Sequence, residues 1–178
     1  MEKDRSAWLW EIFGFGVVSL LGTLLHFLYD LTGGALWIAP FSGVNESTWE
    51  HMKLLFWPML IFGVIQGFFF RERGDFLCVK LKGTLLGLVL IPLIFYTYNG
   101  VIGKSPDWVN IAIFFVAAAA AYFYEARQFS KEEKLCPRPV LAVVIFCVIA
   151  VMFILFSFYP PRLAVFQDPL TLTYGISD

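Results

Sequence analysis

Charged residues are scarce in this chain. Only 15% of its 178 residues are Asp, Glu, Lys or Arg, whereas 59% are hydrophobic. A soluble domain carries about 25% charged residues, so this composition excludes an ordinary soluble fold and indicates a protein that uses lipid as its solvent. The net charge is −1 and no basic run is present, so nothing indicates nucleic acid as a partner.

Histidine and cysteine are rarer still. There are two histidines, and the spacings H-E-x-x-H, E-x-x-H and H-x-x-x-H are all missing, which removes the strong sequence signatures of a metal centre. Cys78, Cys136 and Cys147 show no C-x-x-C spacing. Because all three fall near the predicted cytoplasmic side or in mid-membrane, we expect neither a disulfide nor a structural zinc site. No A-x-A-like cleavage site follows the first apolar stretch, so we interpret it as an uncleaved span.

Long apolar runs are abundant, and five can each cross roughly 30 Å of hydrocarbon. They cover about residues 8–30, 51–70, 77–98, 107–124 and 140–159. The predicted fold is therefore all-α: an integral membrane bundle of five transmembrane helices in a single domain over residues 1–178, with a tail of residues 160–178. Glu11 and the glycines of the first span favour its packing inside the bundle, and Ala117 to Ala121 form a strip suited to close helix approach.

Basic residues are unevenly divided between the two sides of the predicted membrane. One side carries ten of them: Lys3, Arg5, Arg71, Arg73, Lys80, Lys82, Arg127, Lys131, Lys134 and Arg138. The other side carries Lys53, Lys104 and Arg162. Because cytoplasmic loops hold the excess of Lys and Arg, we predict a cytoplasmic N-terminus and an outer C-terminus. We expect the membrane to be a bacterial plasma membrane.

Polar residues gather where the first span ends and the second begins, on the predicted outer side. Ionisable groups near or within membrane spans are costly and mark candidate functional sites. This outer cluster consists of His26, Asp30, Asn45, Glu46, Glu50, His51 and Lys53.

Two kinds of chemistry suit these residue types. Acid–base catalysis would use His26, Asp30, Glu50, His51 and Lys53, because histidine titrates close to neutrality. A divalent metal such as zinc would be bound by His26, Asp30, Glu46 and Glu50. We expect ligand contacts from a further set: Asn45, Glu46, Tyr98, Asn99 and Arg162.

A structural network explains the same residues equally well. Asn45 is a good helix N-cap, and an acid in the first turn favours the positive end of the helix dipole. Glu46 and Glu50 are like charges four residues apart, and Lys53 is placed to neutralise one of them. The tail is rich in proline and aromatic residues, and we expect it to fold back over the outer mouth. There Arg162 would pair with a carboxylate of the cluster or with a lipid headgroup.

Two blocks of sequence carry a family resemblance. The string Val-Asn-Glu-Ser-Thr-Trp-Glu-His-Met-Lys at residues 44–53, with His-Phe-Leu-Tyr-Asp at 26–30 and the tail at 167–176, resembles an uncharacterised family of small bacterial multi-pass membrane proteins. The signature of that family is Val-Asn-Glu-Ser-x-Trp-Glu-His-x-Lys. The resemblance implies a site at these positions and implies no particular activity.

Three functional hypotheses remain open at this point. The first is an outward-facing metal-binding or hydrolase-type active site. The second is a small transporter or binder of a lipid, an ion or a polar solute. The third is a non-catalytic interaction subunit in which the polar cluster only holds helices together.

Overall fold

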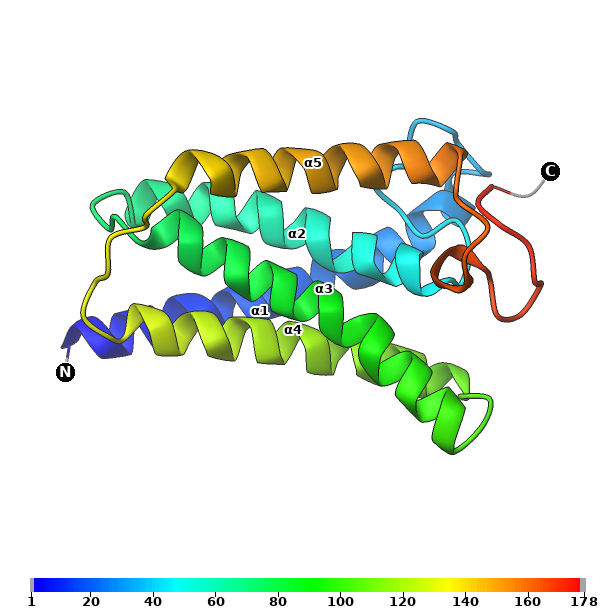
Figure 1. Cartoon of the computed structure of the whole chain (residues 1–178), viewed down its shortest axis with the longest axis horizontal. Helices are drawn as coiled ribbons and strands as arrows, with labels where there is room; N and C mark the ends of the chain where they lie inside the picture. The colour runs from blue at the N-terminus through cyan, green and yellow to red at the C-terminus, as the bar shows by residue number, and fades with distance from the viewer. Residues whose placement is uncertain (1, 177–178) are drawn as a thin grey trace.

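The structure, a computed structural model, describes residues 2–176 and consists of five long helices and one short 3-10 turn (Figure 1). All five helices are long and apolar enough to cross a membrane, which confirms the predicted all-α class and the number of spans. The elements are α1 (Glu2–Leu31), α2 (Thr48–Phe69), α3 (Phe76–Val101), α4 (Asp107–Phe129), α5 (Pro139–Phe158) and η1 (Ala164–Phe166).

The two ends of the bundle differ in what they carry. The tail end holds the loop 32–47, the turn 102–106 and the segment 159–176, and the N-terminal end holds the connections 70–75 and 130–138. Figure 1 shows the two chain termini at these opposite ends, as an odd number of spans requires. The charge bias predicts that the N-terminal end faces the cytoplasm.

Helices α2, α3 and α4 form the centre, and α1 and α5 lie at the periphery. The most apolar stretches of the central helices are 44–56% buried, but those of α1 and α5 only 17%. The expectation that the first span packs inside the bundle is therefore wrong, since only one face of α1 is covered. That face carries Glu11, Gly14, Val18 and Gly22, and its glycines let α2 and α4 approach.

Helices α3 and α4 pack closely against each other. Ala117, Ala118 and Ala121 are fully buried, and a Cβ placed on Gly87 of α3 would lie 3.4 Å from the Cβ of Ala121. Small residues on both helices thus bring the two backbones together, as the alanine strip predicts.

A disulfide at the N-terminal end corrects a sequence-based expectation. Cys78 on α3 is bonded to Cys136 in the α4–α5 connection, with a Cα–Cα distance of 5.6 Å. The Cys136 backbone N–H also donates to the Gly74 carbonyl at 3.1 Å. The two cysteines are 58 residues apart in sequence, so their spacing gave no sign of the pair. It forms because the connection folds back against the start of α3.

Candidate functional site at the tail end

The start of α2 sets the geometry of the outer cluster. Ser47, not Asn45, is the N-cap, and its hydroxyl accepts a hydrogen bond from the Glu50 backbone N–H at 3.4 Å. Asn45 instead accepts from the Ser47 backbone N–H and donates to the Gly175 carbonyl at 3.0 Å. Glu46 therefore precedes the helix, so it does not share a helix face with Glu50, contrary to the sequence-based expectation.

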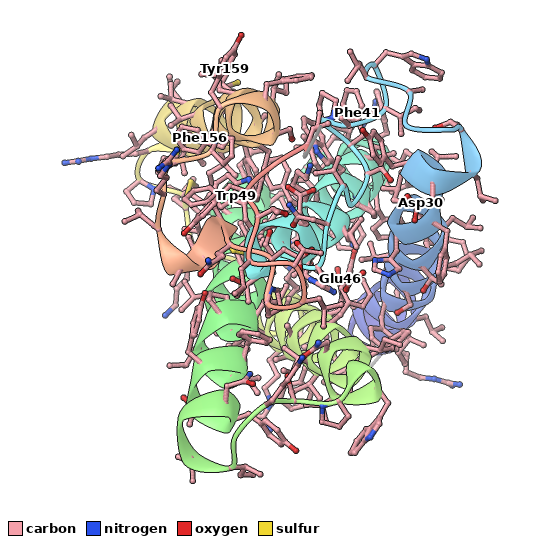
Figure 2. All side chains as sticks on the ribbon, turned by 90° about the vertical axis from the view of Figure 1, so that its right-hand side faces the viewer. Asp30, Phe41, Glu46, Trp49, Phe156 and Tyr159 are labelled. Carbon is pink, nitrogen blue, oxygen red and sulfur yellow. A yellow bond between two sulfur atoms is a disulfide. The ribbon has the colours of Figure 1, made fainter. Side chains whose placement is uncertain are left out.

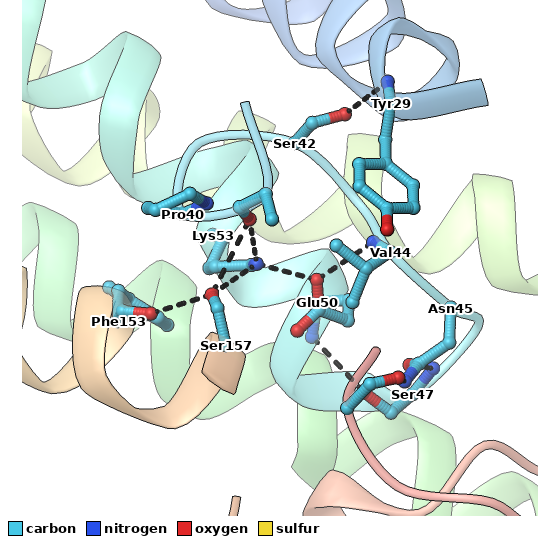
Figure 3. Close-up of polar contacts among 12 residues, drawn as sticks. Tyr29, Pro40, Ser42, Val44, Asn45, Ser47, Glu50, Lys53, Phe153 and Ser157 are labelled. Atoms are coloured by element: carbon cyan, nitrogen blue, oxygen red, sulfur yellow. Dashed lines mark hydrogen bonds and ion pairs between the residues drawn. The ribbon is translucent and has the colours of Figure 1, made fainter. Parts of the chain in front are cut away.

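The loop 32–47 is anchored to α1 through Ser42. The Ser42 hydroxyl accepts from the Tyr29 backbone N–H at 3.0 Å and donates to the Leu25 carbonyl. The hydroxyl thus replaces the helical hydrogen bond that would otherwise join the Tyr29 N–H to the Leu25 carbonyl. Because Ser42 is buried, this bridge fixes the path of the loop towards the outer cluster (Figure 3).

Lys53 and Glu50 form the first half of the outer cluster. The Lys53 Nζ lies 2.6 Å from Glu50 Oε2, and it donates to the Ala39 carbonyl at 2.7 Å and to the Ser157 hydroxyl at 2.8 Å. Glu50 Oε2 also accepts from the Val44 backbone N–H at 3.0 Å. All three ammonium hydrogens are therefore used, and the group joins the loop, α2 and α5 (Figure 3). Such saturation indicates a structural lock.

His26, Glu46 and His51 form the second half, which we call the imidazole–carboxylate site. The His26 Nε2 lies 3.5 Å from Glu46 Oε1, and the His51 Nε2 lies 3.6 Å from Glu46 Oε2. The two imidazole rings are 5.7 Å apart between centroids. The side chains are 27%, 36% and 12% exposed for His26, Glu46 and His51, so a ligand can reach the carboxylate.

The hydrogen bonding of His51 defines the kind of group that this site can bind. Its Nδ1 lies 2.9 Å from the Ser47 carbonyl, and because a carbonyl only accepts, Nδ1 carries the proton. In the neutral ring, Nε2 then presents a lone pair to the Glu46 carboxylate. Two acceptors that face each other repel unless a proton, or a ligand that donates hydrogen bonds, lies between them.

An apolar cleft of about 80 Å³ adjoins the imidazole–carboxylate site. His26 and His51 line its polar side, while α4 contributes Ile111, Phe114 and Phe115. Phe27 and Ile111, which flank the cleft, are 53% and 56% exposed, so it opens at the surface between α1 and α4. This volume is far below the roughly 300–1,000 Å³ of drug-sized pockets. It fits only a small group or a short part of a larger molecule.

Asp30 and Arg162 are separated from this site. Asp30 is exposed at the end of α1 and lines a shallow depression with Leu24, Phe27 and Leu31. Figure 2, which looks onto the tail end, shows Glu46 nearer the centre and Asp30 towards the edge formed by α1. Arg162 is exposed, and among the described residues it forms no ion pair with Asp30, Glu46 or Glu50.

Tyr98 and Asn99 have structural surroundings. The Asn99 carboxamide accepts from the Ser105 backbone N–H at 2.8 Å and donates to the Phe95 carbonyl at 2.8 Å, which closes the α3–α4 turn. Tyr98 is half-buried against the hydrophobic core. The turn therefore uses the polar groups of Asn99. Neither Tyr98 nor Asn99, from which we expected ligand contacts, is part of the imidazole–carboxylate site.

The predicted zinc ligands are not assembled as one set. Among the side chains that the structure describes, no group of three or more His, Cys, Asp and Glu residues is arranged to hold a metal ion. Glu50 faces Lys53, whereas His26 faces Glu46. Because Glu50 is paired with Lys53 and Asp30 is exposed at the end of α1, the four predicted ligands do not converge.

The tail covers the start of α2. The Thr48 hydroxyl donates to the Val165 carbonyl at 3.1 Å, and the Trp49 ring lies 4.6 Å from the Phe166 ring between centroids. Figure 2 shows Trp49 between α5 and the tail. The expected return of the tail over this end is confirmed, and its contacts are largely aromatic.

Sequence reasoning missed Ser157, the partner that brings α5 into the lock. Ser157 is fully buried, and besides accepting from Lys53 it donates to the Phe153 carbonyl at 2.8 Å. The signal was present, because Ser157 is a lone hydroxyl residue in the apolar sequence of α5. A polar residue in such a helix indicates a partner in the protein.

Comparison with known proteins identifies the family without adding an activity. A family of unknown function, DUF6512, matches residues 1–176. No curated protein and no solved structure matches the chain. Since the match extends over almost the whole sequence, this multi-pass membrane protein belongs to the family of unknown function DUF6512.

Proposed function

We propose that the protein binds an amphipathic molecule with a positively charged amine head group at the tail end, which faces the outside of a bacterial plasma membrane. The observation that carries this proposal is the arrangement of Glu46 between His26 and His51 beside the apolar cleft. This proposal corresponds to the second hypothesis from sequence, in which the protein binds a lipid or a polar solute.

Charge supports an amine as the head group. An ammonium placed at Glu46 would donate to the carboxylate and to the lone pair of His51 Nε2, and its charge would strengthen the bond to the carboxylate. The site is also partly sheltered, because the His51 side chain is only 12% exposed. A charge pair there is screened less than one in open water.

The walls of the cleft support an apolar chain behind that head group. Four apolar side chains are part of its lining: Leu54, Ile111, Phe114 and Phe115. A cleft of about 80 Å³ holds only part of a lipid. The rest of the chain would extend past exposed Phe27 and Ile111 into the bilayer.

The structural hypothesis applies to the other half of the cluster. Lys53 and Glu50 are almost fully buried and have polar partners from the loop and α5. We assign them to holding the tail end together, so that the loop presents Glu46 to the histidines. The signature residues of the chain would then divide into a lock and a binding site.

Binding of a long-chain alkylamine, measured by calorimetry on the protein in nanodiscs, tests the proposal. The alkyl alcohol of equal length is the neutral control ligand. We expect the amine to bind at one per chain, and Glu46→Gln to weaken it about tenfold or more, as loss of one charge contact of about 1.4 kcal/mol implies. The exposed Glu132 lies at the other end, so Glu132→Gln should bind normally.

Two results would overturn the proposal. Equal affinity for the amine and the alcohol would show that charge is not recognised. Stoichiometric Zn²⁺ binding that is lost in both His26→Ala and His51→Ala, without amine binding, would support the metal-site hypothesis instead.

A further inference from the structure

A second polar cluster lies buried in the half of the bundle near the N-terminal end. It brings together Glu11 from α1, Gln66 from α2, Lys80 from α3, and Tyr122 and Glu125 from α4. None of these side chains is more than 4% exposed. The sequence indicates Glu11 and Gln66 as polar residues within spans, but it gives no reason to join them to Lys80 and Glu125.

Lys80 stands between two carboxylates. Its Nζ forms an ion pair with Glu125 Oε2 and lies 4.0 Å from Glu11 Oε2. The Gln66 Nε2 donates to the other oxygen of Glu11, Oε1, at 2.5 Å. The cluster thus contains two acids and one base, and with all three ionised it would hold an uncompensated negative charge in a dry interior. Such a charge is costly.

Unpaired oxygen atoms indicate where the compensating charge belongs. Among the described residues, Glu11 Oε2 and Glu125 Oε1 are buried without a hydrogen-bond partner. Both carboxyl groups lie within 4.0 Å of the same Lys80 ammonium, so they occupy one small buried space. One proton on either carboxyl group would remove the excess charge.

We propose that Glu11 and Glu125 share one bound proton, which makes this cluster a buried proton-binding site. Two carboxyls that share a small space do not both ionise, because the like charges repel. Lys80 stabilises the remaining negative charge. The site is separate from the imidazole–carboxylate site at the tail end and does not depend on the function proposed for that site.

A cavity adjoins the cluster at Lys80. Lys80 and Thr84 line a cavity of about 700 Å³ between α2, α3 and α5, which reaches Arg71 and Arg73 at the N-terminal end. The Lys80 side chain therefore contacts the carboxylates on one side and the cavity on the other. Exchange with the predicted cytoplasmic side would pass this ammonium.

Infrared spectroscopy of the purified protein at neutral pH tests the site, because a protonated carboxyl has a C=O band distinct from that of a carboxylate. We expect this band in the wild type, with a shift after exchange into D₂O. Glu11→Gln and Glu125→Gln should each remove it, while Glu132→Gln should retain it.

The wild-type spectrum decides the proposal even if a variant does not fold. Absence of the band at neutral pH would overturn it, and so would its persistence in both glutamine variants. Glu125→Asp, which keeps the carboxyl, should retain a band at a shifted position. Loss of the wild-type band on addition of Na⁺, with stoichiometric binding of radioactive Na⁺, would show that the site takes a metal cation in place of a proton.

Discussion

The ammonium of Lys53 lies 2.6 Å from the carboxylate of Glu50, and neither side chain is more than 3% exposed. Lys53 also donates to Ser157 on α5 and to Ala39 in the loop. One cation therefore connects three parts of the chain that meet at the tail end. The connection helps to hold the peripheral helix α5, much of whose surface is uncovered, against the rest of the bundle.

Replacing Lys53 should destabilise the protein strongly. Lys53→Met leaves Glu50 as a buried charge without its counterion, which typically costs about 3–5 kcal/mol. The double variant Lys53→Met, Glu50→Leu should lose less than Lys53→Met alone, since no uncompensated charge remains. Thermal unfolding of the detergent-solubilised protein measures both, and equal losses in the two variants would contradict the role of the pair.

Two glycines on α1 should respond in opposite directions to alanine. A Cβ on Gly14 would lie 2.5 Å from a ring carbon of Phe62 and 2.6 Å from one of Tyr122, whereas one on Gly16 meets nothing within 4 Å. We expect Gly14→Ala to cost about 1–3 kcal/mol through overpacking. The matched change Gly16→Ala should stabilise by up to about 1 kcal/mol.

Unfolding midpoints of the two glycine variants in the same detergent provide the measurement. A neutral Gly14→Ala would show that α1 does not pack closely against α2 and α4 at this point.

Acid should weaken the N-terminal end through Asp75. Burial raises the pKa of Asp75, but the hydrogen bonds from Arg73 and from the Lys134 backbone N–H outweigh it, so its pKa lies below the ordinary value of 3.8. The guanidinium of Arg73 binds both carboxylate oxygens at 2.9 Å. A carboxyl group whose pKa is lowered in the folded state contributes its full stabilisation when the pH is above its unfolded-state pKa. That stabilisation is lost as the pH falls through the folded-state pKa.

The unfolding midpoint between about pH 5 and pH 3, around the ordinary range of Asp, tests this linkage. Asp75→Asn should be less stable than wild type at the higher pH, and this difference in stability should shrink as the pH is lowered. A difference that is constant with pH would show that the charge of Asp75 does not contribute.

The Cys78–Cys136 disulfide and the distribution of basic residues predict opposite orientations of the protein in the membrane. The bond lies at the N-terminal end, which the basic residues assign to the reducing cytoplasm. If the N-terminal end faces the cytoplasm, as the ten basic residues on that side predict, both cysteines should be thiols in cells and should oxidise after purification. Alkylation of acid-quenched cells followed by mass spectrometry should find both cysteines modified.

The opposite orientation has a distinct result. A disulfide already present in quenched cells would place the N-terminal end outside and the imidazole–carboxylate site on the cytoplasmic side. Cys147, which is exposed and unpaired, serves as the internal control for alkylation.

The sequence around α2 predicted one feature of the outer cluster correctly and misplaced another. The three-residue spacing of Glu50 and Lys53 made their pairing foreseeable, and it is observed. The N-cap was misplaced by two residues because Asn45 and Ser47 are both good capping residues. That error moved Glu46 onto the helix and away from its two histidines.

The number of spans and the all-α class followed from the sequence alone, because a span depends on its own length and hydropathy and on no other part of the chain. Only the tertiary structure decided which polar groups meet. Glu46 lies between histidines from α1 and α2, and Lys80 lies between acids from α1 and α4. Such contacts depend on helix rotation and on the path of the loops, which the packing of glycine and alanine faces determines across distant parts of the sequence.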